Sequence, residues 1–218
     1  MLLVNILSPR TSLSAKGINK RYINQDSSNA HVVKNEARIL GIDDSPFKKF
    51  KDKRVLLIGT FFRGGSSLDG VLTTTAAVDG SDATARIIRM VKKSKFLLQL
   101  RAIMLNGIAV GGFNVIDINK LSSETKIPVI VIMRNYPEAG RMKSSLARLG
   151  MEQKVKLLEK AGTIHKAGNV FIQLAGIGLA DAEELLKISC TRSNIPEPVR
   201  VAHLIAAGVK LGESSGKA

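Results

Sequence analysis

Short runs of branched and aromatic residues alternate with amphipathic stretches from about residue 34 to the end of the chain. Runs rich in Val, Ile, Leu and Phe that are bounded by turn residues are typical of β-strands. The pattern predicts strands at residues 38–42, 54–62, 71–78, 101–105, 128–133 and 170–174. The first three follow one another with short connections, which indicates an antiparallel meander.

Helical spacing begins after the third predicted strand. Beyond Asp82, inward-facing positions recur at intervals of three and four residues, with basic residues on the opposite side, and this predicts an amphipathic helix. The inward positions are Thr84, Ile87, Ile88 and Val91, and the basic positions are Arg86, Arg89 and Lys93. Further helices are predicted around residues 113–123, 141–161, 179–189 and 199–211.

The order of these elements predicts the fold class. The runs at 101–105 and 128–133 are almost continuously apolar, as in parallel strands that are covered on both faces. Strands followed by alternating strands and helices predict an α/β fold with a mixed sheet and flanking helices. Residues 1–33 lack this periodicity, so we expect a flexible basic tail there and one domain over residues 34–218.

Composition adds a strong positive charge. The 218 residues include 33 Lys and Arg against 18 Asp and Glu, which gives a net charge of +15. Such an excess indicates a polyanionic partner, nucleic acid above all, and the alternative is that the charges only solvate the surface. Aromatic residues make up only 4% and Trp is absent, which argues against a stacking platform for single strands.

The chain also excludes several other classes of protein. Its single cysteine, Cys190, cannot form an intrachain disulfide, and no Cys/His group has zinc-site spacing. No apolar run approaches the roughly 18 residues needed to cross a bilayer, and the first residues do not match a signal peptide. We therefore expect a cytoplasmic protein without a membrane partner, and the sequence gives no indication of its oligomeric state.

Acidic and amide side chains follow three of the predicted strands. Asp43 and Asp44 end the first, Asp82 follows the third, and Asn106 ends the fourth. Ligands of such sheets gather at the carboxyl ends of strands, and hard oxygen donors favour Mg²⁺ or Mn²⁺. We therefore predict a metal site formed by Asp43, Asp82 and Asn106, with Asp44 as a further ligand, for hydrolysis of a phosphodiester.

Each of these acids also has a structural alternative. Asp43 or Asp44 would start a turn before Pro46, and Asp82 would cap the helix that follows it. No nucleophilic triad or Walker motif offers a different chemistry.

Basic and glycine-rich positions are the candidates for contact with nucleic acid. Arg side chains neutralise phosphates, and glycines either let a backbone approach a base or simply close a tight turn. The candidates are Arg63, Gly64, Gly65, Arg86, Arg89, Gly107, Arg192, Arg200 and His203. For Arg200, an ion pair with Glu197 is the alternative.

Several long strings in one order resemble the archaeal endonuclease dU family. They are residues 39–47 (ILGIDDSPF), 62–65 (FRGG), 68–71 (LDGV), 78–84 (VDGSDAT), 103–108 (IMLNGI), 112–118 (GFNVIDI) and 195–205 (IPEPVRVAHLI). That family is similar in turn to endonuclease V, and residues 196–198 (PEP) followed by Arg200 support the link.

The resemblance implies a ribonuclease H-like fold, with a mixed five-stranded sheet and flanking helices. It also implies a divalent-metal-dependent endonuclease that nicks DNA near deoxyuridine, in DNA repair. It matches Asp43 to the metal ligand of the first strand and Asp82 to the acid at the start of the following helix.

Two departures from the family pattern change this expectation. The relatives carry Asp-Gly where this chain has Asn106-Gly107, and endonuclease V has a His near residues 176–178. Loss of one negative charge leaves a slower or more Mn²⁺-dependent enzyme, a non-catalytic nucleic-acid-binding protein, or a site rebuilt around Asp44 or Asp79. A nuclease that acts on modified RNA is a further alternative, because similar sheets serve both nucleic acids.

Overall fold

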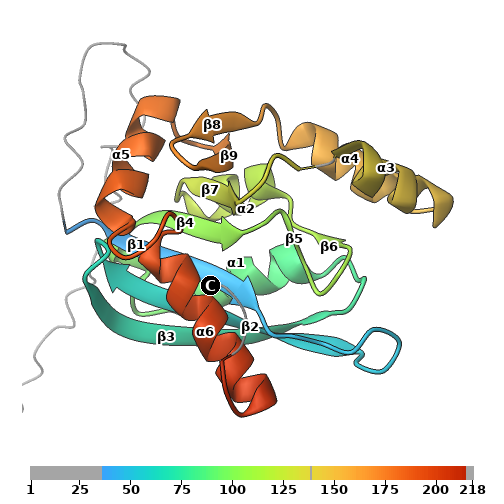
Figure 1. The fold of residues 1–218 in the computed structure, drawn as a ribbon, viewed down its shortest axis with the longest axis horizontal. Helices are drawn as coiled ribbons and strands as arrows, with labels where there is room; N and C mark the ends of the chain where they lie inside the picture. Colours follow the sequence, from blue (N-terminus) through green and yellow to red (C-terminus); the bar gives the residue numbers. More distant parts are fainter. Residues whose placement is uncertain (1–35, 138, 215–218) are drawn as a thin grey trace, which may run out of the picture. The chain divides into compact units, whose positions relative to one another are not determined.

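Seven strands form one mixed sheet in the computed structural model, which describes residues 36–137 and 139–214 (Figure 1). In spatial order the strands are β3 (Ser67–Ala77), β2 (Arg54–Arg63), β1 (Arg38–Asp44), β4 (Leu100–Asn106), β7 (Val129–Met133), β9 (Val170–Ala175) and β8 (His165–Ala167). The three central strands β1, β4 and β7 are parallel, and every other neighbouring pair is antiparallel.

The mixed α/β sheet is confirmed, with seven strands where the family resemblance implies five. β9 pairs with β7 and β8 pairs with β9, so two antiparallel strands extend the sheet beyond β7. β8 has only three residues and no apolar run, which is why the pattern does not reveal it. The third strand begins earlier than predicted because its pairing with β2 continues to Ser67, opposite Arg63.

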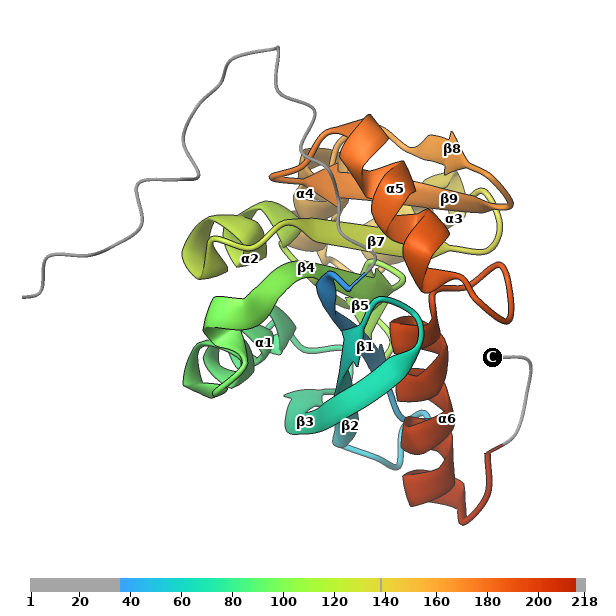
Figure 2. The ribbon, with the colours of Figure 1, turned by 90° about the vertical axis from the view of Figure 1, so that its left-hand side faces the viewer.

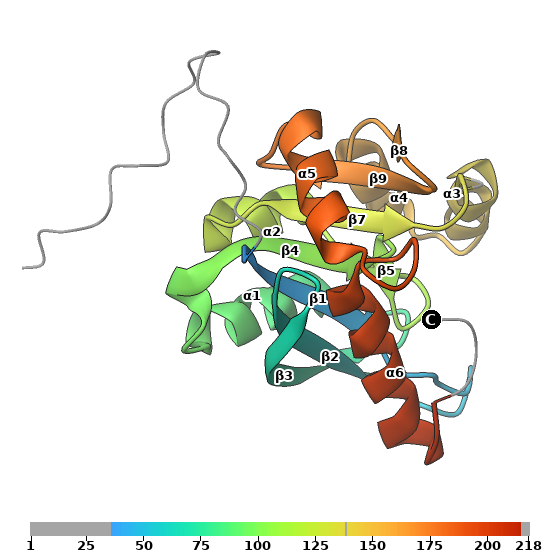
Figure 3. The ribbon, with the colours of Figure 1, turned by 60° about the vertical axis from the view of Figure 1, so that its left-hand side comes forward.

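Helices cover both faces of this sheet. In the described part of the chain they are α1 (Ala83–Lys93), α2 (Ile118–Thr125), α3 (Ala139–Arg148), α4 (Glu152–Lys160), α5 (Leu179–Ser189) and α6 (Glu197–Leu211), with one 3-10 turn, η1 (Leu97–Gln99). The sheet separates α1 and α2 from α5 and α6 (Figures 2 and 3). A small hairpin of β5 (Ala109–Val110) and β6 (Asn114–Val115) follows β4.

The helical pattern predicted over residues 141–161 divides into two helices. Gly150 adopts a left-handed backbone, with φ +67°, directly after α3. The N–H of Met151 then donates to the carbonyl of Leu146 at 2.9 Å, which closes the end of α3 before α4 begins. A positive φ is the usual way to stop a helix, and glycine adopts it without steric cost.

Successive side chains of β1 point to opposite faces, as strand geometry requires. Leu40 and Ile42 lie in the hydrophobic core beneath α1 and α2. Ile39 lies in the core beneath α5. Gly41 and Asp43 therefore share the face of Ile39, which α5 and α6 cover.

The start of α6 lies directly against Gly41. A Cβ atom on Gly41 would overlap the backbone carbonyl of Pro198, so the helix approaches this closely only because the strand has no side chain there. Thr60, the neighbour of Gly41 on β2, is fully buried and its hydroxyl donates to the Pro198 carbonyl at 2.5 Å. Two adjacent strand positions thus fix the beginning of α6.

The expected tail of residues 1–33 lies outside the described residues, and the described ones fall within one unit, residues 33–218. Across residues 36–137 and 139–214, no helix has the length and apolar character required to span a membrane.

Replacing Gly41 by Ala is expected to lower the free energy of unfolding by about 1–3 kcal/mol, because the added methyl group pushes α6 away from the sheet. Gly208→Ala is the matched control: it lies within α6 with open space beside it, and should raise stability by about 0.5–1 kcal/mol. Urea unfolding of both variants measures the difference. Equal stabilities for Gly41→Ala and wild type would show that the close approach is not required.

Candidate functional site

A buried carboxylate, Asp43, lies at the end of the central strand β1. Asp43 is only 3% exposed. Ile42 of β1 pairs in register with Leu105 of β4, so Asp43 lies beside Asn106 on the same face of the sheet. The Asn106 amide Nδ2 donates to Asp43 Oδ2 at 2.9 Å. The structure thus brings together these two residues, both of them sequence candidates.

His203 of α6 contacts the same carboxylate oxygen. Its Nδ1 lies 2.8 Å from Asp43 Oδ2, although 160 residues separate the two in sequence. The hydrogen bond to Asp43 raises the pKa of His203, against the opposing effect of partial burial. The sequence marked His203 only as a contact for nucleic acid, and its pairing with Asp43 follows from the position of α6 over Gly41.

Asp44 points to the other face of the sheet. Its Oδ2 accepts a hydrogen bond from the Gly111 N–H at 2.8 Å, in the turn between β5 and β6. Burial raises the pKa of Asp44 to about 6; the Gly111 hydrogen bond opposes this shift and the charge of Asp43 adds to it. The pKa of Asp44 therefore lies above its ordinary value of 3.8, but the Asp44 carboxylate does not join the contacts between Asp43, Asn106 and His203.

Asp82 is held by a different set of partners. Its Oδ1 accepts hydrogen bonds from the Ala77 N–H and from Asn114 Nδ2, both at 2.9 Å. Its Oδ2 pairs with Arg54 at 3.3 Å and with Arg86 at 3.2 Å. Partial burial alone would raise the pKa of Asp82, but these hydrogen bonds outweigh it and lower the pKa to about 2.

The structure therefore does not bring Asp82 into contact with Asp43. Nor does the Asp82 side chain cap α1, since within the described residues the Ala83 N–H at the helix start donates to Asn114 instead. Arg54 and Asn114, which hold Asp82, were not among the sequence candidates. The sequence does not indicate which acid a polar residue beside a strand end will bind.

Asp79 has a backbone role. It adopts a left-handed conformation, with φ +52°, and its Oδ1 accepts the Phe113 N–H at 2.8 Å. Its main-chain carbonyl accepts a hydrogen bond from the Lys154 ammonium group at 2.6 Å. These contacts tie the start of the β3–α1 connection to the β5–β6 turn and to α4.

The turn at Gly64 and Gly65 lies at the opposite end of β1 from Asp43. The Gly64 N–H donates to the Ala37 carbonyl at 2.8 Å, just before β1 begins. Five residues of strand then separate this point from Asp43, a distance of roughly 15–20 Å. A Cβ on Gly65 would overlap the Ser189 carbonyl, so close packing accounts for that glycine.

The basic candidates divide by the partners that they have. Arg200 forms two hydrogen bonds to the buried Glu197, at 2.7 and 2.9 Å, and Arg63 pairs with Asp69 at 3.1 Å. Arg89 and Arg192 are exposed, and neither has an acidic partner among the residues that the structure describes. Arg192 follows Thr191, whose hydroxyl bonds to the Gly65 carbonyl, and so lies near the far end of the sheet.

A basic groove of about 320 Å³ lies between α1 and β3. Its cationic side chains are Arg86, Arg89 and Lys93, and no acidic residue lines it. Hydroxyl groups of Thr73, Thr74 and Ser94 also line this groove. A positively charged channel with hydroxyl donors is suited to a phosphate backbone.

The donor set at Asp43 fits one hard divalent cation better than two. In residues 36–137 and 139–214, no three His, Cys, Asp or Glu side chains converge as a metal site. Asp43 supplies one carboxylate and Asn106 one amide oxygen, while the His203 imidazole contacts the Asp43 carboxylate. Mg²⁺ retains several waters and needs only one or two carboxylates, so this set fits a single ion of that class. Gly107, with φ +86°, leaves open space next to Asn106 among the described residues.

The chain is similar to the members of one protein family. A model of the family described as Endonuclease dU matches residues 35–210. A protein named UPF0215 protein from Methanothermobacter thermautotrophicus is 52% identical over 202 residues, which cover 90% of this chain and 99% of that protein.

Two solved structures are also similar. The crystal structure of a protein of unknown function from Archaeoglobus fulgidus has a TM-score of 0.74 and 43% identity, and the match covers 79% of this chain and 97% of that one. Endonuclease V from Streptomyces avermitilis has a TM-score of 0.52 at 12% identity, covering 79% of this chain and 80% of that one. The second likeness is one of fold.

Asp82→Asn is expected to lower the free energy of unfolding by about 1–2 kcal/mol at neutral pH, because Arg54 and Arg86 lose their charged partner. The pKa of Asp82 is about 2 in the folded state, below its ordinary value of 3.8. The ionised Asp82 carboxylate therefore stabilises the fold fully above about pH 3.8, and this contribution is lost as the pH falls toward about 2. Urea unfolding between neutral pH and about pH 3 should show a gap between wild type and variant that narrows with acid.

Glu184→Gln on α5 is the control, because Glu184 is exposed beyond the first turn of the helix and its carboxylate has no hydrogen-bond partner within the described part of the chain. It should change stability little. A gap for Asp82→Asn that stayed constant or widened with acid would contradict the ion-pair role.

Proposed function

The chain belongs to the endonuclease dU family, and on this premise we propose that it is a metal-dependent endonuclease that nicks DNA near deoxyuridine. Such an activity belongs to the repair of deaminated bases. The fold, which is similar to that of endonuclease V, supports a nuclease, and the net charge of +15 supports a polyanionic substrate.

One observation carries the proposal: side chains from two other elements converge on a single buried carboxylate oxygen. Asn106 comes from β4 and His203 from α6, and both contact Asp43 Oδ2. The site lies at the carboxyl ends of adjacent parallel strands, where α/β sheets hold their ligands. Burying a carboxylate is costly unless it is paired, and these contacts stabilise Asp43 in place.

Asp43 and the amide oxygen of Asn106 would hold Mg²⁺ or Mn²⁺. A bound cation of this kind supplies an activated water and neutralises charge that develops on the phosphate. His203 orients the Asp43 carboxylate through Nδ1. Its Nε2 has no partner among the described residues. In the imidazolium form, which the raised pKa of His203 favours, Nε2–H would donate a hydrogen bond to a phosphate oxygen.

A basic surface suited to the substrate backbone also lies on the α1 side of the sheet, opposite the face that carries Asp43. Arg89 and Lys93 in the groove beside α1 are suited to phosphates, and Arg86 is shared with Asp82. A deaminated base must leave the stack before it is read, and uracil opposite guanine leaves it at low cost. The open space next to Gly107 would let such a base approach the backbone beside Asn106.

A non-catalytic nucleic-acid-binding protein is the second candidate, and Asn106 is the observation that favours it. Its amide donates to Asp43 instead of adding a second negative charge. A neutral amide attracts a divalent cation more weakly than a carboxylate does. The two candidates differ in whether bound nucleic acid is cut.

Asp43→Asn is expected to reduce nicking of a uracil-containing duplex by roughly 100-fold or more, because it removes the charge at the centre of the site. The assay compares labelled DNA duplexes with uracil, inosine or no lesion, and a modified RNA, each with Mg²⁺, Mn²⁺ or chelator. Asp181→Asn, on α5, is the matched control and should cut like wild type. Full activity of Asp43→Asn, or activity in chelator, would overturn the proposal, and cleavage of RNA alone would redirect it.

Asn106→Asp should raise the rate of nicking and lower the Mg²⁺ concentration that nicking requires, because a second carboxylate joins Asp43. Without metal the added charge should lower the melting temperature by repulsion, and Mg²⁺ or Mn²⁺ should restore it more than in wild type. Asn169→Asp adds the same charge at an exposed site and serves as control. Duplex binding without a nick in both wild type and Asn106→Asp would favour the non-catalytic candidate.

A further inference from the structure

The loop that follows Asp44 carries a bare aromatic ring at its tip. Phe50, between β1 and β2, is 97% exposed. This loop projects beyond the edge of the sheet where β1 ends (Figure 1). A single exposed apolar residue is ordinary on a protein surface, so exposure alone assigns no role.

The backbone at Phe50 makes the residue type unexpected. Its φ of +66° lies in the left-handed region, which bulky side chains rarely adopt and which glycine or asparagine adopts easily. Neither burial nor backbone preference therefore explains a phenylalanine here. Such outliers are found where a binding surface requires a particular side chain.

Hydrogen bonds hold the turn in one shape. The N–H groups of Lys51 and Asp52 donate to the Lys48 carbonyl at 3.1 and 2.9 Å. The Asp52 carboxylate accepts the Lys48 N–H at 2.9 Å and pairs with Lys210 of α6 at 3.0 Å. The turn therefore presents the Phe50 ring from a fixed base, which reduces the entropy lost when the ring binds.

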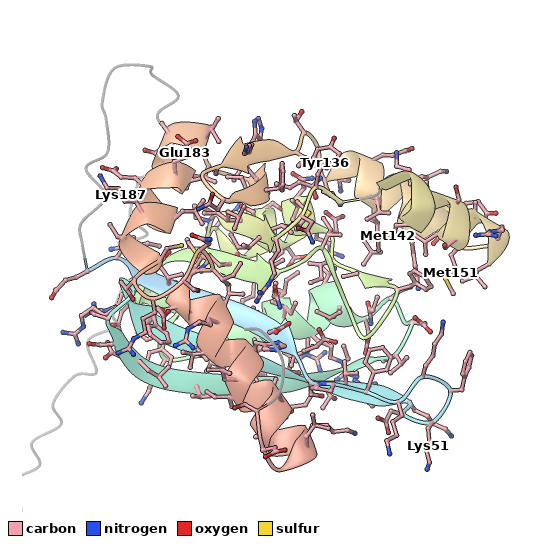
Figure 4. The ribbon with its side chains drawn as sticks, in the orientation of Figure 1. Lys51, Tyr136, Met142, Met151, Glu183 and Lys187 are labelled. Carbon is pink, nitrogen blue, oxygen red and sulfur yellow. The ribbon has the colours of Figure 1, made fainter. Side chains whose placement is uncertain are left out.

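Positive charge surrounds the ring. The four exposed lysines of the loop are Lys48, Lys49, Lys51 and Lys53. The Lys49 ammonium group lies 5.3 Å from the centre of the Phe50 ring, and Lys51 points outward from the loop (Figure 4). An aromatic ring among cations matches a nucleobase flanked by phosphates.

The loop is also joined directly to the candidate site. Ser45, next to Asp44, continues the pairing with β2, since its N–H donates to the Leu56 carbonyl at 2.8 Å. Phe50 follows Asp43 by only seven positions in the chain, so the two Cα atoms lie at most about 25 Å apart. A duplex bound at Asp43 would thus pass within reach of the ring.

We propose that Phe50 inserts beside a nucleobase of the bound duplex and stacks on it where a base has left the helix, while the loop lysines pair with the flanking phosphates. This inference rests on the proposed binding of DNA but not on its cleavage. Aromatic or aliphatic wedges stabilise an opened base step by replacing the lost stacking. An anionic membrane is the competing partner, but one phenylalanine buries too little apolar surface for stable anchoring.

Phe50→Gly in the full chain tests this role without loss of the fold, because glycine relieves the left-handed backbone and should leave stability equal or higher. Binding is measured in chelator, by anisotropy, to a duplex with a uracil–guanine pair next to 2-aminopurine. Phe50→Gly should weaken binding roughly 5- to 100-fold and abolish the rise in 2-aminopurine fluorescence, and Phe50→Trp should retain both. Lys51→Ala should instead reduce the salt dependence of binding and keep the fluorescence rise.

Leu98→Ala is the matched control, since Leu98 is 90% exposed on η1, and it should behave as wild type. Wild-type affinity and fluorescence for Phe50→Gly would overturn the proposal, even if the protein nicks DNA. Reduced binding for Phe50→Gly in a protein that never nicks would uphold it and overturn only the nuclease function. Phe50-dependent binding to phosphatidylserine vesicles, with duplex binding unchanged, would assign the loop to a membrane.

Discussion

The close contact between α6 and β1 at Gly41 determines the geometry of the candidate site. A helix that starts against a bare strand position, with its Pro198 carbonyl held by Thr60, has little freedom to slide or rotate. One turn and a half further along α6, His203 then lies above the strand position two residues beyond Gly41, which is Asp43. The imidazole and the carboxylate therefore meet because of a packing contact that involves neither of them.

Strand geometry separates the two neighbouring carboxylates and gives them different chemistry. Asp43 faces α6 and pairs with an imidazole and an amide. Asp44 faces the β5–β6 turn, where burial raises its pKa to about 6. In contrast, Asp82 lies among arginines, and its carboxylate stays ionised well below neutral pH. Asp82 thus stabilises the fold through its ion pairs, whereas Asp43 lies next to groups that are suited to binding a ligand.

The sequence predicts the parts of this arrangement that depend on local periodicity and on strand order. All six apolar runs form strands, and the neighbouring ends of β1 and β4 bring Asp43 to Asn106. Beyond a strand end, tertiary packing sets the direction of a side chain, so local sequence does not predict the partners of Asp82. The place of the Gly64 turn follows from strand order alone, because a turn after β2 of an antiparallel pair lies beside the start of β1, away from Asp43.

The length of α6 sets a fixed spacing on the surface around the site. His203 and Lys210 are seven residues apart, so they lie on one side of the helix and are separated by about 10 Å. The first contacts Asp43 and the second contacts Asp52 at the base of the β1–β2 loop. The helix therefore couples the candidate site to the β1–β2 loop through one rigid element, so a displacement of α6 would move both contacts together.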